Sequence, residues 1–377
     1  MNARQLRSII VKPIGSFCNL RCEYCFYLDK HNLYNGQPST HKMSDATLEK
    51  MIQGMFTCSD FPTFTWQGGE PTILGLEFFQ KVVAIQKSYG KKYSNALQTH
   101  GMLLDEAWAD FLLEENFLVG ISLDGPEEIH DRYRKDAQGR GTFQQVFTNA
   151  KMLLEHNVPV NILATVNDYS VKYPLKIYKF LVENGFNFMQ FSPVVEINPN
   201  NPDIAAPYSV NAKDYGNFLS KLFKIWLKDF DFDRLQQKTS IRFFDSLIKI
   251  YIGMQPDHCA LHKNCNDYLV VEHNGDLFSC DFLVAEDTKL GNLHDISLTD
   301  AFNSTAHTAF GQRKADFGTE CQQCQWLHLC YGGCIKDRLH DPRDKGHNHF
   351  CQSYKVFFKQ ADQHLKKFAM LYKQNYQ

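Results

Sequence analysis

The sequence predicts an α/β fold, with a parallel sheet or partial (β/α)6 TIM-like barrel, followed by a cysteine-rich C-terminal domain. Over the first two hundred residues, six strand-like runs alternate with amphipathic stretches, at roughly the 25–50-residue spacing of successive βα units. Eight of the twelve cysteines lie between residues 259 and 351. The 377 residues are 44% hydrophobic, which is enough apolar material for a sizeable core.

The strand-like runs are short and rich in β-branched or aromatic residues. They are Ser8–Pro13, Phe64–Trp66, Asn95–Thr99, Leu118–Leu123, Val160–Val166 and Phe188–Val194. The amphipathic stretches between them lie near 44–57, 75–90, 105–116, 142–156 and 173–185. Ser44 is a candidate N-cap of the first helix, although the capping box is incomplete. Strands that alternate with helices favour parallel pairing.

The second half of the chain follows a different pattern. Residues 197–209, rich in Asn, Pro and Ala, predict a loop or linker, and helices follow near 211–230 and 241–252. Asn274-Gly275 separates two alternating runs, 268–273 and 276–280, which favours a hairpin with a type I′ turn. The tail from Cys351 to Gln377 predicts one amphipathic helix. We therefore expect a domain over 1–230 and a second over 231–377.

Charge and hydropathy exclude several classes of protein. The formal net charge is −2, whereas a nucleic-acid-binding protein usually carries a basic excess. Residues 1–13 contain only the short apolar run Ile9–Val11, which is too short for the core of a signal peptide. No stretch approaches the ~18 consecutive apolar residues of a membrane-spanning helix. We expect a soluble cytoplasmic protein without nucleic-acid or membrane partners.

The cysteines predict metal sites, because cytosolic thiols stay reduced and clustered ones more often bind metal. The first group, Cys18-x3-Cys22-x2-Cys25, follows the first strand directly. A [4Fe–4S] cluster has four irons, so three thiolates would leave one iron open to a small molecule. Zinc with three protein ligands and an open position is the alternative. The eight C-terminal cysteines fit two four-ligand sites, and Cys58 is left over, as a small buried hydrophobe.

The N-terminal motifs resemble those of the radical S-adenosylmethionine (SAM) superfamily. Phe26-Tyr27 follows the three cysteines, and Gly68-Gly69-Glu70-Pro71 follows the second strand. The two glycines let backbone approach a ligand closely, and Glu70 can accept from an ammonium group. In that family this motif holds the methionine amino group, and an arginine suits the carboxylate. The resemblance implies SAM contacts from Tyr24, Gly69, Ser122, Arg134 and Val195; taken alone, Arg134 would be a solvated surface charge.

The C-terminal spacing C-x2-C-x5-C-x3-C resembles the SPASM extension, which carries two auxiliary [4Fe–4S] clusters. Two structural zinc ribbons are the alternative. The resemblance implies three [4Fe–4S] clusters in all, the SAM cluster being held by Cys18, Cys22 and Cys25. It assigns auxiliary cluster I to Cys259, Cys265, Cys280 and Cys334. It assigns auxiliary cluster II to Cys321, Cys324, Cys330 and Cys351.

Over nearly the whole chain the sequence resembles the anaerobic sulfatase-maturating enzymes. The matching stretches are 25–27, 66–72, 97–101, 119–126, 279–282, 290–292 and 351–355. The resemblance implies oxidation of a Cys or Ser to formylglycine in an unfolded or nascent sulfatase, within a Cys/Ser-x-Pro-x-Arg motif, with SAM cleaved to 5′-deoxyadenosine and methionine. It also implies a flavodoxin or ferredoxin-type electron donor. His100, where the family commonly has Asn, and the loop after Phe191 depart from the pattern, so the choice between Cys-type and Ser-type substrates stays open.

The same resemblance implies roles near the substrate. A deoxyadenosyl radical removes a hydrogen from Cβ, the first auxiliary cluster takes an electron, and Asp281 accepts a proton. An anionic cluster beside Asp281 would make its carboxylate more basic. Taken alone, Asp281 would be a turn or capping carboxylate. Tyr27 and Gln67 match substrate-facing positions; a core aromatic and a strand-end amide are the alternatives.

Two other functions fit parts of the sequence. The first is a SPASM-type maturase of a ribosomally made peptide, which forms thioether or carbon–carbon links. Many such enzymes carry a peptide-recognition domain at the N-terminus, and only 17 residues precede Cys18 here, which favours the sulfatase maturase. The second is a non-enzymatic scaffold with about three zinc ions, which would be colourless.

Overall fold

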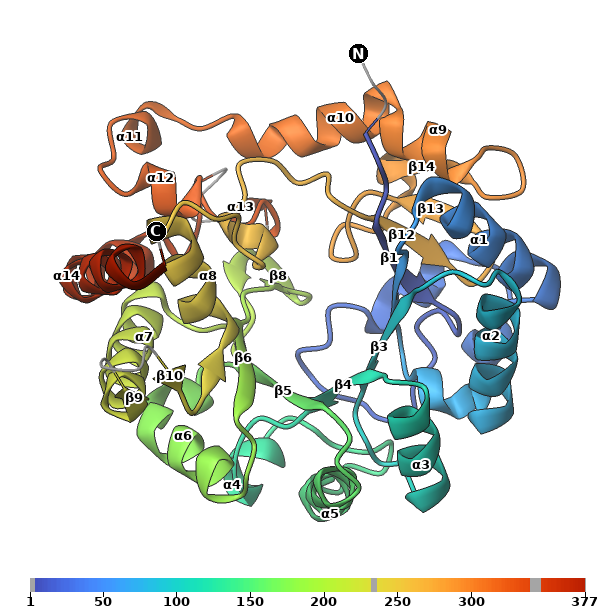
Figure 1. The fold of residues 1–377 in the computed structure, drawn as a ribbon, viewed down its shortest axis with the longest axis horizontal. Coiled ribbons are helices and arrows are strands. Elements are labelled where there is room, and N and C mark those ends of the chain that lie inside the picture. Colours follow the sequence, from blue (N-terminus) through green and yellow to red (C-terminus); the bar gives the residue numbers. More distant parts are fainter. Residues whose placement is uncertain (1–3, 232–235, 340–346, 377) are drawn as a thin grey trace. The chain divides into compact units, whose positions relative to one another are not determined.

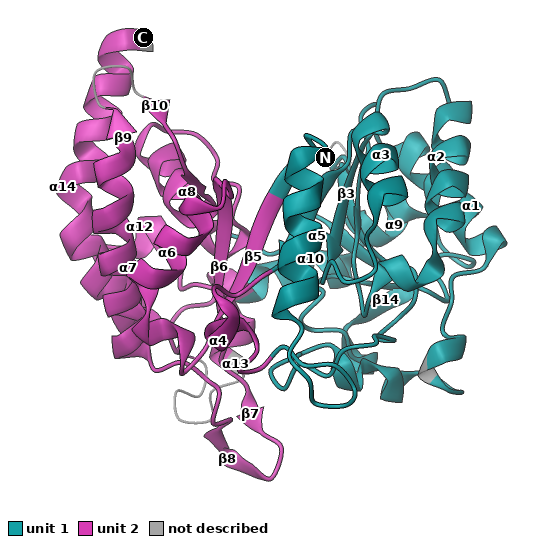
Figure 2. Ribbon diagram, turned by 90° about the horizontal axis from the view of Figure 1, so that it is seen from below, with its two compact units in different colours: residues 1–122, 134–160, 264–313 teal, residues 123–133, 161–263, 314–377 magenta. Residues whose placement is uncertain are grey.

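The computed structural model describes residues 4–231, 236–339 and 347–376. The chain forms two compact units, each built from several segments (Figure 2). Unit 1 contains Met1–Ser122, Arg134–Val160 and Asn264–Arg313, and unit 2 contains Leu123–Tyr133, Asn161–Lys263 and Lys314–Gln377. Strands alternate with helices along the first two hundred residues (Figure 1), so the predicted α/β class is confirmed.

The sheet of unit 1 contains four parallel strands from the N-terminal half. They are β1 (Ser8–Lys12), β2 (Thr63–Trp66), β3 (Ser94–Thr99) and β4 (Leu118–Ser122). The chain returns much later with β12 (Leu269–Glu272), β13 (Asp276–Phe278) and β14 (Lys289–Asn292), which gives the order β4-β3-β2-β1-β12-β13-β14. Strand β12 runs parallel to β1, and its register pairs Lys12 with Glu272. Residues 260 positions apart in the chain are therefore neighbours in the sheet.

Amphipathic helices accompany this sheet. They are α1 (Asp45–Cys58), α2 (Leu76–Ser88), α3 (Glu106–Glu114), α5 (Phe143–Glu155), α9 (Leu298–Asn303) and α10 (Thr305–Gln312). Ser44 caps α1, because its hydroxyl accepts from the backbone N–H of Thr47 at 3.2 Å. Their apolar faces bury large side chains such as Phe64, Trp66 and Phe79. The predicted strands and helices of this region are confirmed.

Three parallel strands come from the segments of unit 2, namely β5 (Val160–Val166), β6 (Phe188–Pro193) and β11 (Ser240–Ile241), in the order β11-β6-β5. The helices of unit 2 are α4 (Glu127–His130), α6 (Pro174–Glu183), α7 (Ala212–Trp226), α8 (Arg242–Tyr251), α11 (Thr319–Gln322), α12 (Leu327–Cys330), α13 (Lys336–Leu339) and α14 (Cys351–Tyr376). Helices α7 and α14 approach closely at Gly216, where a Cβ would lie 3.0 Å from the Ser353 Cα. The predicted helices of this half, including the C-terminal one, are confirmed. No helix among the described residues, α14 included, combines the length and the apolar character needed to cross a bilayer.

Three sequence predictions were wrong in detail. The predicted loop 197–209 contains a hairpin of β7 (Ile197–Asn198) and β8 (Asn201–Ala205), whose turn the Asn198 side chain closes by accepting from the N–H of Asn200. The hairpin β12–β13 has a three-residue loop instead of a type I′ turn, because only Gly275 (φ 88°) is left-handed there and its N–H bonds to the carbonyl of Glu272. Cys58 is half-buried instead of fully buried, because it ends α1 and its Sγ lies 3.1 Å from the Thr299 hydroxyl.

Candidate active site

The three-cysteine loop of unit 1 follows the carboxyl end of β1, where α/β folds place ligands. Its backbone is held at several points: the N–H of Arg21 bonds to the carbonyl of Lys135 at 2.8 Å, and the N–H of Cys25 to the carbonyl of Cys22 at 3.1 Å. The N–H of Leu20 donates to Cys18 Sγ at 3.3 Å. Burial raises the pKa of the Cys18 and Cys25 thiols. Thiolates there need a positive partner, so these donors suit a metal cluster.

The turn after β2 packs its backbone against the segment that leads into this loop. The N–H of Gly69 bonds to the carbonyl of Gly15 at 2.8 Å, and the N–H of Glu70 to that of Phe17 at 2.9 Å. A Cβ on Gly69 would lie 2.0 Å from the Phe17 carbonyl oxygen. We expected the two glycines to admit a ligand. In the structure, Gly69 is also required by the contact between these two chain segments.

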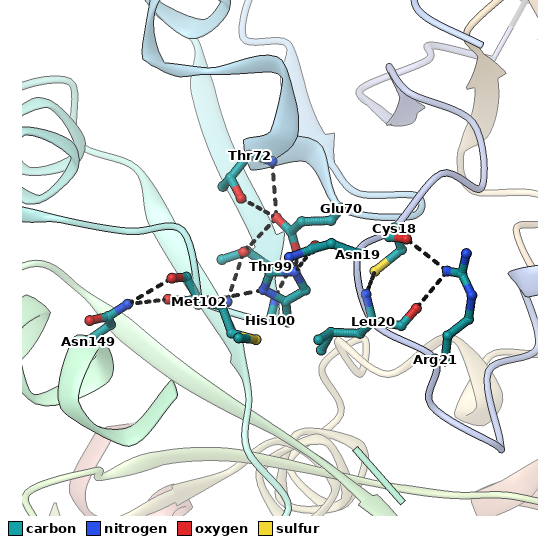
Figure 3. Close-up of polar contacts among 11 residues, drawn as sticks. Cys18, Asn19, Leu20, Arg21, Glu70, Thr72, Thr99, His100, Met102 and Asn149 are labelled. Carbon is teal, nitrogen blue, oxygen red and sulfur yellow. Dashed lines mark hydrogen bonds and ion pairs between the residues drawn. The ribbon is translucent and has the colours of Figure 1, made fainter. Parts of the chain in front are cut away.

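Glu70 is 1% exposed and is held by groups of the protein (Figure 3). Its Oε1 accepts from the backbone N–H and the hydroxyl of Thr72, at 3.0 and 2.6 Å, and from the Thr99 hydroxyl at 2.7 Å. Its Oε2 accepts from the backbone N–H of His100 at 2.9 Å. The carboxylate therefore joins the ends of β2 and β3. The sequence suggested an acceptor for an ammonium group and gave no sign of this bridge.

Tyr24 and Arg134, two of the predicted SAM contacts, lie together in unit 1. The Arg134 guanidinium carbon is 5.5 Å from the centre of the Tyr24 ring, and Arg134 is only 8% exposed. Arg134 is thus not the solvated surface charge that its residue type alone would suggest. Ser122 ends β4 in the same unit. Val195 is buried in unit 2, where its carbonyl accepts from Lys336 Nζ at 2.8 Å.

Asp281 and Gln67 also lie close together, on segments 214 positions apart. Gln67 Nε2 lies 3.5 Å from Asp281 Oδ2, and the Tyr268 hydroxyl lies 3.2 Å from Asp281 Oδ1. Asp281 is 8% exposed, so an amide and a hydroxyl orient a nearly buried carboxylate. Such a carboxylate can accept a proton from a group that enters beside it.

Two charged residues beside Tyr27 were not predicted from the sequence. The Tyr27 hydroxyl donates to the buried carboxylate of Glu272, and Lys12 Nζ lies 4.3 Å from the centre of the Tyr27 ring. Burial and the Glu272 charge raise the pKa of Tyr27. Burial lowers the pKa of Lys12, while Asp281 and Glu272 act in the opposite direction. The one available signal was a charged residue at the end of each of two apolar strands, Lys12 in SIIVK and Glu272 in LVVE.

Four C-terminal cysteines line one cavity in unit 2. They are the predicted ligands of auxiliary cluster II: Cys321, Cys324, Cys330 and Cys351. Burial raises the pKa of the Cys351 thiol to about 11 and raises that of Cys321 and Cys330 as well. Four converging thiols in a cavity of this kind fit a four-cysteine cluster. Glu320 and His347 lie beside Cys351 and offer further ligand atoms.

The four cysteines predicted for auxiliary cluster I belong to both units. Cys265 and Cys280 are in unit 1, where the N–H of Cys265 bonds to the carbonyl of Gly311 and the Tyr268 hydroxyl lies 3.9 Å from Cys280 Sγ. Cys259 and Cys334 are in unit 2. Lys314 Nζ donates to the carbonyl of Cys259 at 2.8 Å, and the Asn348 side-chain amide donates to the carbonyl of Cys334 at 3.2 Å. This ligand set stays a prediction.

Comparisons with known proteins support these motifs. The Radical SAM superfamily model matches residues 13–181, and an iron–sulfur cluster-binding domain (SPASM) matches 259–325. A serine-type anaerobic sulfatase-maturating enzyme from Bacteroides thetaiotaomicron is 38% identical, over 93% of this chain and 88% of that protein. A cysteine-type enzyme from Clostridium novyi is 39% identical, over 93% and 94%.

Comparison with solved structures finds similarity to the same kind of protein. Native anSMEcpe with bound AdoMet and Cp18Cys peptide has 36% identity and a TM-score of 0.85, over 96% of this chain and 98% of that one. Streptococcus suis SuiB bound to its precursor peptide SuiA, at 14% identity and TM-score 0.65, over 93% of this chain and 77% of that one, shares the fold.

These similarities decide between the functions considered for the sequence. They confirm the radical SAM enzyme class, with iron–sulfur clusters and SAM as cofactors, and they contradict the zinc scaffold. The domain boundary near residue 230 stays a prediction, because the two matched regions end at 181 and begin at 259. Since relatives above 30% identity cover nearly the whole chain, this protein belongs to the anaerobic sulfatase-maturating enzymes of the radical SAM superfamily.

Proposed function

We propose that this enzyme oxidises a Cys or Ser residue of an unfolded or nascent sulfatase to formylglycine, within a Cys/Ser-x-Pro-x-Arg segment. The observation that carries the proposal is the nearly buried Asp281 carboxylate, oriented by Gln67 and Tyr268 in the unit that also holds the three-cysteine loop. Relatives of both the serine type and the cysteine type support the reaction class. The similar structure of anSMEcpe contains a bound Cp18Cys peptide, which supports a peptide substrate.

In this reaction, residues of the chain itself accept one proton from the substrate. When bound, SAM and the clusters supply the radical that removes a Cβ hydrogen and the acceptor that takes one electron. Asp281 receives the proton of the substrate thiol or hydroxyl, while Gln67 and Tyr268 hold the carboxylate in place. A Cys residue that loses this proton, the hydrogen atom and the electron becomes a thioaldehyde, and water converts it to the aldehyde and hydrogen sulfide. Tyr27 and Gln67 position the substrate side chain.

The cofactors bind to the residues predicted from the sequence. Arg134, beside the Tyr24 ring, binds the SAM carboxylate, and Gly69, Ser122 and Val195 complete the SAM contacts. Cys18, Cys22 and Cys25 hold the SAM cluster. Cys259, Cys265, Cys280 and Cys334 hold auxiliary cluster I, and Cys321, Cys324, Cys330 and Cys351 hold auxiliary cluster II. A cytoplasmic flavodoxin or ferredoxin-type protein supplies the electron.

Mass spectrometry of a modified peptide tests the proposal. The enzyme, purified without oxygen, is incubated with SAM, a reductant and an 18-residue-scale sulfatase peptide that contains the target Cys. Conversion to the aldehyde lowers the mass by roughly 18 Da, whereas formation of a crosslink by a peptide maturase lowers it by only ~2 Da. A loss of ~2 Da, or none, from the Cys peptide contradicts the proposal.

Two variants separate the steps. Asp281→Asn should keep 5′-deoxyadenosine release and depress formylglycine formation, because it removes only the proton acceptor. Cys22→Ala should abolish 5′-deoxyadenosine release. Asp110→Asn, at an exposed carboxylate, is the matched control for the first variant. Normal aldehyde yield in Asp281→Asn would remove Asp281 from this role.

A further inference from the structure

His100 is a buried histidine between the three-cysteine loop and Glu70. It follows β3 directly and is 6% exposed. Figure 3 shows its ring between the Glu70 carboxylate and Asn19, the residue that follows Cys18. Two of the motifs in the sequence, the cysteine loop and the Gly-Gly-Glu-Pro turn, therefore meet at this one side chain.

The hydrogen bonds fix the tautomer of the ring. The backbone N–H of Met102 donates to His100 Nδ1 at 3.1 Å, so Nδ1 carries a lone pair and the ring proton lies on Nε2. Nε2 is 2.7 Å from Asn19 Oδ1 and 3.3 Å from Glu70 Oε2. Asn19 is the nearer acceptor and receives the shorter bond. Burial lowers the pKa of His100; the Glu70 charge opposes this shift and the Arg134 charge adds to it.

Asn19 transmits the contact to the cysteine loop. It adjoins Cys18, and the N–H of Leu20 donates to Cys18 Sγ, so a movement of residues 19 and 20 would move the thiol. The Arg21 side chain binds carbonyls of the loop itself, Cys18 O at 2.8 Å and Leu20 O at 2.9 Å. His100, directly after β3, thus contacts the loop at Asn19, the residue next to its first cysteine.

The other side of His100 is rigid. Glu70 Oε1 already accepts from Thr72 and Thr99, and Oε2 accepts from the backbone N–H of His100. Asn149 Nδ2 donates to the carbonyls of Gly101 and Met102, at 2.8 and 3.3 Å, and holds the turn that carries the ring (Figure 3). The ring therefore has a fixed place from which to hold Asn19.

We propose that His100 is a positioning residue whose Nε2–H holds Asn19, and with it Cys18, at a fixed place relative to Glu70. The inference rests on the proposed function, because it assumes that the loop holds the cluster to which SAM binds. It deepens that function by naming the residue that sets the geometry between the cluster loop and the Gly-Gly-Glu-Pro turn. Its effect should appear in SAM binding and cleavage instead of in folding alone.

A double-mutant cycle on the holoenzyme tests the contact. His100→Leu and Asn19→Ala should each lower kcat/KM for 5′-deoxyadenosine release about tenfold, mainly through the KM for SAM, which corresponds to ~1.4 kcal/mol for one buried hydrogen bond. The kcat/KM of the double variant should be no lower than that of the less active single variant, because the two substitutions remove the same hydrogen bond. His100→Gln should restore most of the activity, because its amide nitrogen reaches approximately the place of Nε2.

A matched control separates positioning from general destabilisation. Gln86→Leu removes another buried side chain of unit 1, whose amide exchanges two hydrogen bonds with Asn95, and should lower the melting temperature without changing the KM for SAM. Iron content and the change of the cluster EPR signal on SAM addition are measured for every variant. Additive losses in the double variant, or a normal KM in His100→Leu, would overturn the inference. If His100→Leu does not fold, Asn19→Ala and His100→Gln still decide: a normal KM for SAM in Asn19→Ala, or a raised one in His100→Gln, overturns it.

The failure of this inference differs from failure of the proposed function. The cycle is read without any peptide, so it does not depend on formylglycine formation. A wild-type enzyme that releases no 5′-deoxyadenosine would contradict the radical SAM chemistry itself. An active wild-type enzyme with unaffected His100 and Asn19 variants would contradict only the positioning role.

Discussion

Gly69→Ala tests how the Gly-Gly-Glu-Pro turn supports the cysteine loop. An alanine Cβ at this position would lie 2.0 Å from the Phe17 carbonyl oxygen, 2.4 Å from the Phe17 carbonyl carbon and 2.6 Å from that of Ser16. All three are backbone atoms, which cannot move aside by a rotamer change. Gly69 does not have a left-handed φ, so the alanine backbone itself would be unstrained and the whole effect is steric.

The contacts give the size of the effect. Since real Cβ atoms essentially never approach within 3.0 Å, the loop must retreat by about 1 Å. That movement weakens the bonds from Gly69 N to Gly15 O and from Glu70 N to Phe17 O, each worth ~1 kcal/mol. Overpacking adds ~1–3 kcal/mol. We expect a loss of about 4 kcal/mol in the free energy of unfolding, which is a large part of the ~5–15 kcal/mol of a typical domain.

Urea unfolding of the reduced, metal-free chain measures this loss, and hydrogen exchange locates it. The amides of Gly69 and Glu70 should lose protection first, because their acceptors have moved. Gly318→Ala is the control: no atom lies within 4 Å of its added Cβ and its φ is ordinary, so the change should stay below ~1 kcal/mol. Equal unfolding midpoints for Gly69→Ala and Gly318→Ala would refute the steric argument.

Three further variants address charge and the auxiliary site. Burial raises the pKa of Asp245 to about 6, so the folded state loses stability as the pH rises from ~4 to ~6. Asp245→Asn should therefore be more stable than wild type by up to ~3 kcal/mol at pH 7 and equally stable at low pH. A difference in unfolding free energy that does not change with pH would contradict this. Burial also raises the pKa of Tyr215, so wild type should lose stability above pH ~10, where the unfolded tyrosine ionises, and Tyr215→Phe should flatten that decline in melting temperature. An equal decline in both proteins would contradict the assignment. The buried Arg338 donates to four carbonyls of the 314–332 segment. Arg338→Met should therefore lower the iron content by about one third, which is the share of one cluster in three. An unchanged iron content would show that Arg338 does not support a cluster.

Local sequence was sufficient for the individual elements of the fold. The observed strands β1 to β6 and the helices α1, α2, α3, α5 and α6 lie within about two residues of the predicted ranges, because period-two and period-3.6 patterns are local properties. The short helix α4 (Glu127–His130) was not predicted. The parallel pairing of β12 with β1 was not predictable in this way. Its two strands are more than 250 residues apart, and neither sequence carries a signal for the other.

The same distinction applies to the candidate site. Cysteine spacing indicated the metal-binding residues because ligands on one loop or hairpin are constrained along the chain. The Asp281–Gln67 and His100–Asn19 contacts join residues 214 and 81 positions apart. They depend on which strands are neighbours and on side-chain packing, so sequence reasoning named Asp281, Gln67 and His100 without finding their partners.

The charges buried in unit 1 are informative because folding alone does not favour them. Lys12, Glu70, Glu272 and Asp281 are each at most 8% exposed, and apolar residues of similar size usually stabilise a core at least as well as buried ions. Three of the four adjoin strand ends: Lys12 ends β1, Glu272 ends β12 and Glu70 follows β2. Lys12 and Glu272 are direct neighbours in the parallel register, and their opposite charges offset part of each other's desolvation. A set of buried charges at one edge of a parallel sheet, beside three thiols, is what an electrostatically prearranged active site requires and what a stable core would avoid.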